Sequence, residues 1–297
     1  ACNSATAETV QKNSTQAPQK PNVIVILADD LGYGDLKCYG AKNVETPHVD
    51  KLASEGIRFT NAHTVAATST PSRYSLLTGE YAWRRPDTDI AAGDVKMIIR
   101  PEQYTMADMF KSAGYATAAI GKWHLGLGDK TGGQDWNAPL PAALGDLGFD
   151  YHYIMAATAD RVPCVFIENG KVANYDPSDP IEVSYTKNFP GEPTGKDNPE
   201  LLYNLHPSNG HDMSIVNGIS RIGFMKGGGK ALWKDENIAD SITPFMPSTL
   251  SNSIKTSLSL CILQPMMYTF LVFPMTASVE RILWDYAETQ SPNSTGR

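Results

Sequence analysis

The hydrophobic pattern of the chain predicts two buried strands, each of which runs into charged residues. Residues 22–27 read N-V-I-V-I-L, an apolar run typical of a strand buried on both faces of a parallel sheet, and lead directly into Asp29-Asp30. Residues 115–120 form a second apolar run, which ends at Gly121-Lys122-Trp123-His124. A third, shorter strand is predicted at residues 57–60.

Helix signals alternate with these strands. Each predicted helix has apolar positions at helical spacing, and each is ended by a glycine. Two of them have a proline at or near the first helical position, where its missing N–H costs nothing. The helices, each with its terminating glycine, are 46–53 with Gly56, 71–77 with Gly79, and 105–110 with Gly114. This alternation predicts an α/β fold.

Residues 126–199 are rich in Gly, Pro, Asp and Asn. This composition predicts long surface loops, and loops at the edge of a rigid sheet commonly determine which substrate is bound.

Composition places the chain among ordinary globular proteins. It has 297 residues, 41% hydrophobic and 19% charged, enough for one large domain or two smaller ones. The net charge of −7 argues against a nucleic-acid partner, although a few local cations can still bind an anionic substrate. No stretch is long and apolar enough to span a bilayer. The four cysteines are spaced too irregularly to indicate a disulfide framework or a zinc site.

The first 21 residues are mostly small and polar, and we expect them to form a disordered tether. Cys2, in Ala1-Cys2-Asn3-Ser4, is a candidate for the acylated cysteine of a bacterial lipoprotein. The alternative is that the sequence starts there by chance. A lipid anchor at Cys2 is the one membrane attachment that we expect.

Three groups of reactive side chains are predicted at the same edge of the sheet. Asp29-Asp30 and Lys122/His124 follow strands, and Ser69 lies at a helix start just beyond one. Ligands of open α/β sheets bind at this edge. Two adjacent carboxylates suit a hard cation such as Ca²⁺ or Mg²⁺. The helix N-terminus and Lys122 favour an anion such as sulfate, and His124 can supply a proton.

Each group, taken alone, also has a purely structural interpretation. An Asp-Asp pair after a strand is more often a solvated turn, Ser69 more often a helix cap, and Lys122 and His124 more often loop residues. His211-Asp212 is expected at the surface, and Gly227-Gly228-Gly229 is expected to be a flexible loop. Only the joint occurrence of the first three groups, in order, favours a site.

Four segments together resemble the type I sulfatases of the alkaline-phosphatase-like superfamily. The most specific is S-T-P-S-R-Y-S-L-L-T-G, which matches the family signature S-x-P-S-R-x-x-L-x-T-G. The four segments are residues 22–35, 46–63, 69–79 and 114–126. The resemblance covers residues 22–243, a partial N-terminal catalytic domain. It implies an alkaline-phosphatase-like α/β fold, with a mixed, mostly parallel sheet flanked by helices and incomplete at the C-terminus.

The resemblance also implies a cofactor chemistry. Ser69 is the position that a dedicated enzyme oxidises to formylglycine, and Pro71 and Ser72 belong to the motif that this enzyme recognises. Ser rather than Cys at this position resembles bacterial members that are matured by a radical enzyme. Asp29 and Asp30 are implied as ligands of Ca²⁺, with Mg²⁺ as an alternative, and residue 69 contacts the same metal.

Three further residues receive roles from the resemblance. Arg73 is implied to hold the formylglycine, Lys122 to contact the sulfate, and His124 to orient or protonate the formylglycine. The implied reaction is hydrolysis of a sulfate ester by a metal-activated aldehyde hydrate. The expected substrate is a sulfated carbohydrate or an aryl sulfate, and the expected location is the bacterial periplasm or outer membrane.

The resemblance ends near Thr243. The family's mid-domain His and its Asp-Asn pair are not visible, and residues 244–297 become Ser-rich and charge-poor. We hypothesise a frameshift: suitable codons across 260–281 permit the shifted string LYFATNDVHIPRFPHDRFRGK, which looks like the family segment that carries this His. A chain with such a tail is expected to lack part of the core sheet, to fold poorly and to turn over little.

The sequence is also compatible with two other functions. One is a phosphatase or phosphodiesterase of the same superfamily that uses unmodified Ser69 or Thr70 with zinc. The other is a surface lipoprotein that binds sulfated glycans without catalysis.

Overall fold

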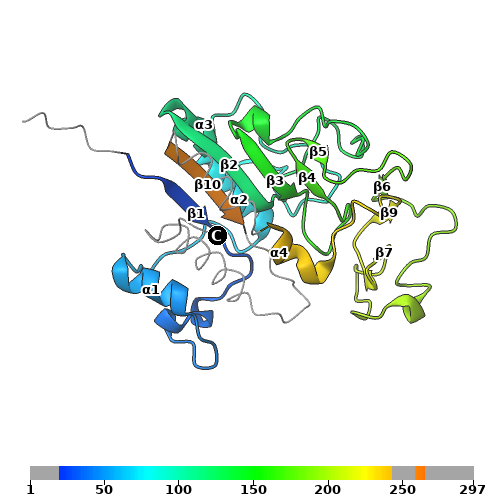
Figure 1. The fold of residues 1–297 in the computed structure, drawn as a ribbon, viewed down its shortest axis with the longest axis horizontal. Coiled ribbons are helices and arrows are strands. Elements are labelled where there is room, and N and C mark those ends of the chain that lie inside the picture. Colours follow the sequence, from blue (N-terminus) through cyan, green and yellow to red (C-terminus); the bar gives the residue numbers. More distant parts are fainter. Residues whose placement is uncertain (1–19, 243–257, 265–297) are drawn as a thin grey trace, which may run out of the picture.

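The computed structural model describes residues 20–242 and 258–264, and its centre is a six-stranded mixed sheet (Figure 1). The first four strands in spatial order are parallel, and the last two continue the sheet in antiparallel pairs. The spatial order is β1 (Val23–Ile26), β10 (Leu258–Gln264), β2 (Tyr115–Lys122), β3 (Tyr151–Met155), β4 (Phe166–Glu168) and β5 (Lys171–Val172).

Helices and two small antiparallel sheets complete the described part of the chain. The helices are α1 (Pro47–Glu55), α2 (Ser69–Thr78), α3 (Met106–Ser112) and α4 (Ile238–Ile242). The small sheets pair β6 (Glu182–Ser184) with β9 (Phe224–Lys226), and β7 (Ile215–Val216) with β8 (Ile219–Ser220). None of the helices described is long and apolar enough to cross a membrane.

The two long apolar runs and the three predicted helices are confirmed within a few residues. The run at 115–120 extends to Lys122 because its last residues pair with β3, and Lys122 lies opposite Met155. The helix expected from Pro71 starts two residues earlier, so Ser69 is its first residue.

The strand predicted at residues 57–60 is wrong. Ile57 and Phe59 are 84% and 67% exposed, and no strand forms there. Two local backbone acceptors are satisfied by side chains instead: Tyr39 Oη donates to the Phe59 carbonyl, and Arg58 donates to the Cys38 carbonyl. The run is too short and too exposed to pair with a neighbouring strand.

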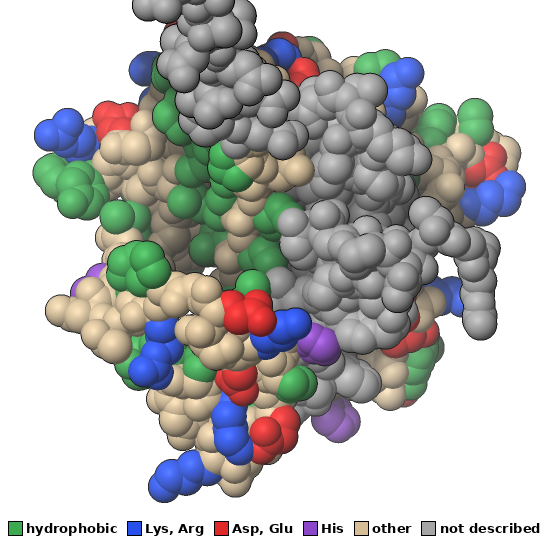
Figure 2. Space-filling model, turned by 60° about the vertical axis from the view of Figure 1, so that its left-hand side comes forward, with side chains coloured by type: hydrophobic (Ala, Val, Ile, Leu, Met, Phe, Trp, Pro, Cys, Tyr) green, Lys and Arg blue, Asp and Glu red, His purple; other side chains and the backbone are tan. Residues whose placement is uncertain are grey.

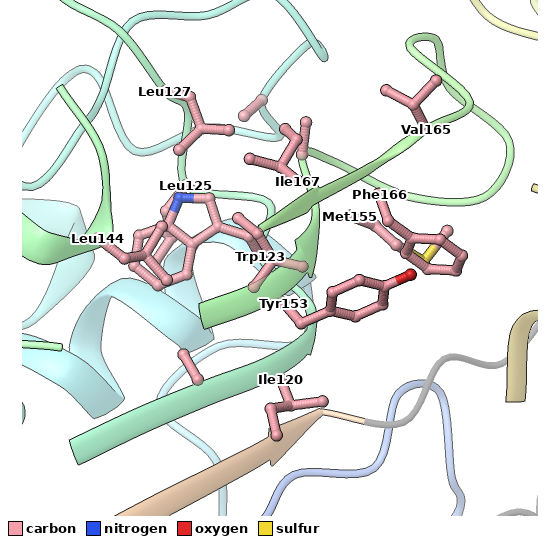
Figure 3. Packing of buried hydrophobic residues seen from close by; sticks show 14 of the residues in the cluster. Ile120, Trp123, Leu125, Leu127, Leu144, Tyr153, Met155, Val165, Phe166 and Ile167 are labelled. Atoms are coloured by element: carbon pink, nitrogen blue, oxygen red, sulfur yellow. The ribbon is translucent and has the colours of Figure 1, made fainter. Parts of the chain in front are cut away.

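The prediction of surface loops over residues 126–199 is only partly right. The segment contains β3, β4, β5 and β6, and it supplies much of the core. Trp123, which follows β2, is 1% exposed, packs edge-on against Phe149 and lies beside Leu125 and Leu144 (Figure 3). Burying side chains of this size stabilises the fold by about 1.5–3 kcal/mol each. The core therefore fixes the loop that leaves β2, where Lys122 and His124 lie.

The strand β10 belongs to residues 244–297, the segment for which a frameshift is hypothesised. It lies between β1 and β2, with Leu260 opposite both Val23 and Thr117. The expected gap in the core sheet is therefore not found, because L-S-L-C-I-L-Q fills this position. An apolar run can occupy a central strand whatever its origin, so the frameshift itself stays a prediction.

The expected N-terminal tether, including Cys2, lies outside the described residues except for its last two positions. These two are tied to the domain: Lys20 Nζ donates to the Ala113 carbonyl at 2.8 Å, and Tyr115 Oη donates to the Pro21 carbonyl at 3.0 Å.

Charges of both signs are mixed over the described surface. Figure 2 shows Lys and Arg side chains interspersed with Asp and Glu on one face, without a broad coloured area of one sign. The pairing of Arg73 and Lys122 at the site described below is therefore a local arrangement of charge.

His152 is expected to make the fold sensitive to acid. It is 3% exposed, and its Nε2 accepts the Gly170 N–H at 2.8 Å. Burial lowers the pKa of His152 from 6.5 to about 4, so the unfolded chain binds a proton more readily than the folded one. Its stabilising contribution is complete above pH ~6.5 and is lost as the pH falls to ~4, a change of about 3 kcal/mol.

Denaturant unfolding at pH 7 and pH 4.5 tests this expectation. The wild-type chain should lose more stability between the two pH values than His152→Gln, which keeps an acceptor but does not titrate. Equal losses in both proteins would show that His152 does not contribute.

Candidate active site

The predicted site residues meet at one edge of the sheet. Asp29 follows β1, Lys122 is the last residue of β2, and Ser69 is the first residue of α2. Parallel strands bring their carboxyl ends to the same edge, which is where open α/β sheets bind ligands.

Asp29 joins two cations in a buried cluster. Its Oδ1 accepts from Arg73 Nη2 at 3.1 Å, and its Oδ2 accepts from Lys122 Nζ at 2.6 Å. All three side chains are less than a tenth exposed. Burial lowers the pKa of both Lys122 and Arg73, and Asp29 opposes that shift. Because one carboxylate contacts two cations, the cluster keeps positive charge at short range, which suits an anionic substrate.

Asp30 differs from its neighbour. It is exposed, whereas Asp29 is 6% exposed, and its backbone is left-handed at φ 53°. Burial lowers the pKa of Arg73 and Lys122, and the charge of Asp30, like that of Asp29, opposes this lowering, so Asp30 lies close to the cluster without replacing Asp29 in it.

Ser69 Oγ lies between a cation and a histidine. It accepts from Arg73 Nε at 2.8 Å and lies 3.0 Å from His124 Nδ1. The other ring nitrogen of His124, Nε2, lies 2.9 Å from the Ala91 carbonyl. A carbonyl can only accept, so Nε2 carries the ring proton, and in a neutral ring Nδ1 accepts from the Ser69 hydroxyl.

The protonation of His124 follows from its surroundings. Burial, followed by the charges of Lys122 and Arg161, lowers the pKa of His124 to about 3. The ring is therefore neutral near pH 7, and Nδ1 can take a proton from residue 69. The expectation that His124 orients or protonates the formylglycine stays a prediction.

The hydroxyl next to Ser69 has a different partner set. Thr70 is 0% exposed; its Oγ1 donates to the His124 carbonyl at 3.0 Å and accepts from Ala91 N–H at 3.1 Å. It holds the backbone around His124 and is not directed at the site. This geometry removes Thr70 as a candidate nucleophile.

The oxygen donors fit a hard cation in kind. Asp29, Asp30 and Ser69 Oγ are the ligand types that Ca²⁺ and Mg²⁺ prefer, but Ca²⁺ takes six to eight oxygens. Among residues 20–242 and 258–264, no group of three or more His, Cys, Asp and Glu side chains could hold a metal. The described residues therefore supply only part of such a shell.

A second polar cluster lies beyond β3 and was missed by sequence reasoning. His211, expected at the surface with Asp212, is partly exposed, and its Nε2 lies 2.9 Å from Asp160 Oδ2. Arg161 Nη1 also contacts the Asp160 carboxylate, at 3.0 and 3.2 Å. His211 and Asp160 are 51 positions apart, so no local pattern could have linked them.

Backbone amides of the glycine run at 227–229 donate hydrogen bonds to Asp179 of the same chain. Gly228 N–H donates to the Asp179 carbonyl at 3.1 Å, and Gly229 N–H donates to Asp179 Oδ2 at 2.7 Å. These two amides are therefore occupied by Asp179.

The comparisons with known proteins agree with the fold and the signature. The family model described as "Sulfatase" matches residues 21–210, and the chain belongs to the sulfatase family. The N-acetylgalactosamine-6-O-sulfatase of Bacteroides thetaiotaomicron is 58% identical over 234 residues, which cover 79% of this chain and 45% of that protein. The steryl-sulfatase of Mus musculus is 48% identical over 120 residues, 37% of this chain and 19% of that protein.

A solved structure confirms the α/β fold. A 6S-sulfatase structure reported with the metabolism of multiple glycosaminoglycans by Bacteroides thetaiotaomicron aligns with a TM-score of 0.87 at 47% identity. The alignment covers 91% of this chain and 59% of that one. The chain thus spans about half the length of the relatives that it matches.

Proposed function

We propose that this chain is the N-terminal catalytic part of a formylglycine-dependent sulfatase that removes the 6-O-sulfate of N-acetylgalactosamine. The observation that carries the proposal is the position of Ser69 Oγ, between Arg73 Nε at 2.8 Å and His124 Nδ1 at 3.0 Å, beside the Asp29–Lys122 pair. The name of the 58% identical relative supports the sugar and the sulfate position.

Each residue of the site has a separate role in such a reaction. A formylglycine at position 69 supplies an aldehyde whose hydrate carries the nucleophilic hydroxyl. Arg73 and Lys122 offset the negative charge that gathers on the sulfate oxygens. His124, neutral and aimed at residue 69 through Nδ1, accepts a proton from that residue. Asp29 holds the two cations in place.

We further propose that Ca²⁺, or Mg²⁺ in its place, binds Asp29, Asp30 and residue 69. The cation would supply a Lewis acid beside the reacting oxygen. Each oxygen of Asp29 accepts one hydrogen bond, from Arg73 or from Lys122, and keeps a second lone pair for a cation. Further oxygen ligands are needed to complete the six to eight that Ca²⁺ takes.

Mass spectrometry of the tryptic peptide that spans Ser69 tests the proposal. The chain is produced with and without a radical formylglycine-generating maturase. Loss of two hydrogen atoms at Ser69, only with the maturase, is the expected result. An intact Ser69 in the presence of the maturase would contradict the proposal and favour the other two functions.

One observation favours a second candidate. A serine hydroxyl that faces a neutral histidine is also the arrangement of an unmodified nucleophile, as a phosphatase or phosphodiesterase of the superfamily would need. An intact Ser69, together with zinc-dependent hydrolysis of a phosphate ester, would establish this reading. A glycan-binding lipoprotein would show neither modification nor hydrolysis.

The proposal includes an impaired activity for this particular chain. If the frameshift hypothesis holds, residues 244–297 replace the family's mid-domain His and its Asp-Asn pair. The nucleotide sequence decides this: the shifted frame after Thr243 must encode the family-like string. A simple aryl sulfate hydrolysed at a normal sulfatase rate by the purified chain would refute the impairment.

We also propose export to the bacterial periplasm or outer membrane, with a lipid on Cys2. Labelled fatty acid should be incorporated into the wild-type protein and not into Cys2→Ala. Equal labelling of the two proteins would contradict the anchor.

A further inference from the structure

Asp160, Arg161 and His211 form a compact polar group, called here the recognition cluster. The Asp160 carboxylate contacts Arg161 Nη1 at 3.0 and 3.2 Å and His211 Nε2 at 2.9 Å. Arg161 Nη1 also donates to Thr158 Oγ1 at 2.9 Å. These contacts fix an acceptor, a planar donor and an imidazole relative to one another.

The recognition cluster lies on the segment that runs beside the reactive residues. The backbone N–H groups of Trp123 and His124 donate to the carbonyls of Met155 and Ala156, at 3.0 and 3.2 Å. The chain that leaves β3 is therefore paired with the segment that carries Lys122 and His124. Asp160 lies four positions after Ala156 in the sequence. The charge of Arg161 contributes to lowering the pKa of His124, so the two side chains lie near each other.

Both halves of the recognition cluster are held rigidly. Ile222 N–H donates to the Asp160 carbonyl at 2.8 Å, and Val162 N–H donates to the Ile222 carbonyl at 3.1 Å. His211 is fixed by its own N–H, which donates to the Ser208 carbonyl at 2.8 Å, and by the Ser220 hydroxyl, which donates to its carbonyl. A preorganised group loses little side-chain entropy when it binds a ligand.

The recognition cluster is also open to solvent. The side chains of Arg161, Asp160 and His211 are 17%, 21% and 21% exposed. Within the described part of the chain, all side-chain hydrogen bonds of Arg161 come from Nη1, which leaves Nη2 and Nε with donors for a ligand. The Arg221–Asp235 pair differs in this respect, since its side chains are 1% and 3% exposed.

The chemistry of the recognition cluster differs from that of the Ser69 site. Arg161 is neutralised by Asp160, whereas Arg73 and Lys122 share the single carboxylate of Asp29. A neutralised group attracts an anion less strongly, but its fixed donor and acceptor match the hydroxyl groups of a sugar. The two sites are therefore complementary: one takes the sulfate and the other takes an uncharged polar ring.

We propose that the recognition cluster binds hydroxyl groups of the sugar ring that carries the sulfate, and so selects a carbohydrate over a simple aryl sulfate. This inference rests on the proposed function, because it takes the Ser69 site as the place where the sulfate binds. Asp160, Arg161 and His211 are specificity-determining residues in this scheme.

Binding measured by titration calorimetry tests the inference without requiring turnover. The two probes are N-acetylgalactosamine 6-sulfate and 4-nitrophenyl sulfate, which has no sugar hydroxyls. Asp160→Asn and Arg161→Lys keep the size or the charge of the side chain and are expected to weaken binding of the sugar sulfate at least tenfold. Binding of the aryl sulfate should change less than twofold. Asp176→Asn, which alters the ion pair with exposed Lys230, serves as the matched control and should affect neither probe.

Every outcome decides between the proposals. Equal weakening of both probes, or no weakening of either, overturns the recognition role, and so does a wild-type chain that binds neither probe. If Asp160→Asn and Arg161→Lys lower the unfolding midpoint, His211→Gln must give the same selective loss for the inference to stand. A selective loss in a chain whose Ser69 stays unmodified in the presence of the maturase supports sugar recognition and contradicts the sulfatase proposal.

Discussion

Replacing Asp29 by Asn is expected to lower the free energy of unfolding by about 3–5 kcal/mol, the usual cost of removing one partner of a buried ion pair. Asp29 is 6% exposed and is bonded to both Arg73 and Lys122. The neutral amide cannot balance their charges, and its NH₂ group would face one of the two cations. Denaturant unfolding at pH 7, followed by circular dichroism, measures the change.

The neighbouring residue provides a matched control. Asp30→Asn is the same chemical change one position further on, at an exposed residue with φ 53°, a conformation that Asn tolerates well. We expect a change within about 0.5 kcal/mol. Equal effects at the two positions would mean that the Asp29 cluster does not hold the site together.

The location of the site shows where sequence reasoning succeeds. The runs that became β1 and β2 were predicted because apolar continuity over several residues is a local signal. Asp29, Ser69, Lys122 and His124 were then expected together because strand ends in a parallel sheet share an edge. The structure confirms that meeting point.

Which atom bonds to which could not be predicted. In the sequence, Asp29 and Asp30 are equivalent, as are the hydroxyls of Ser69 and Thr70. Their roles separate only when the backbone turns one side chain of each pair inward, and a left-handed residue at Asp30 contributes to that turn. The tautomer of His124 likewise depends on the Ala91 carbonyl, which is 33 positions away.

Contacts between distant segments were also outside the reach of local patterns. The recognition cluster joins residues 51 positions apart: Asp160 lies in the region 126–199 that composition described as loops, and His211 lies beyond it. The strand predicted at 57–60 failed for the related reason that a strand needs a partner, which a short exposed run does not reveal.

Replacing Ser69 by Ala is expected to abolish both the modification and the turnover of a sulfate ester. The substitution removes the oxygen that Arg73 Nε and His124 Nδ1 contact, so no aldehyde can form and no nucleophile remains. Loss of a nucleophile costs on the order of 10⁵-fold or more in turnover. Hydrolysis of 4-nitrophenyl sulfate, after production with the maturase, measures the rate. It is measured in the 297-residue chain and in a protein with the shifted frame restored after Thr243.

Thr70→Val is the matched control for Ser69→Ala. It removes the adjacent hydroxyl, whose two partners are backbone groups of His124 and Ala91, and keeps nearly the same shape. We expect about 1–3 kcal/mol less stability, because a buried N–H loses its acceptor. Residue 69 should still be modified. If Thr70→Val abolished turnover without lowering stability while Ser69→Ala retained it, the nucleophile would be Thr70.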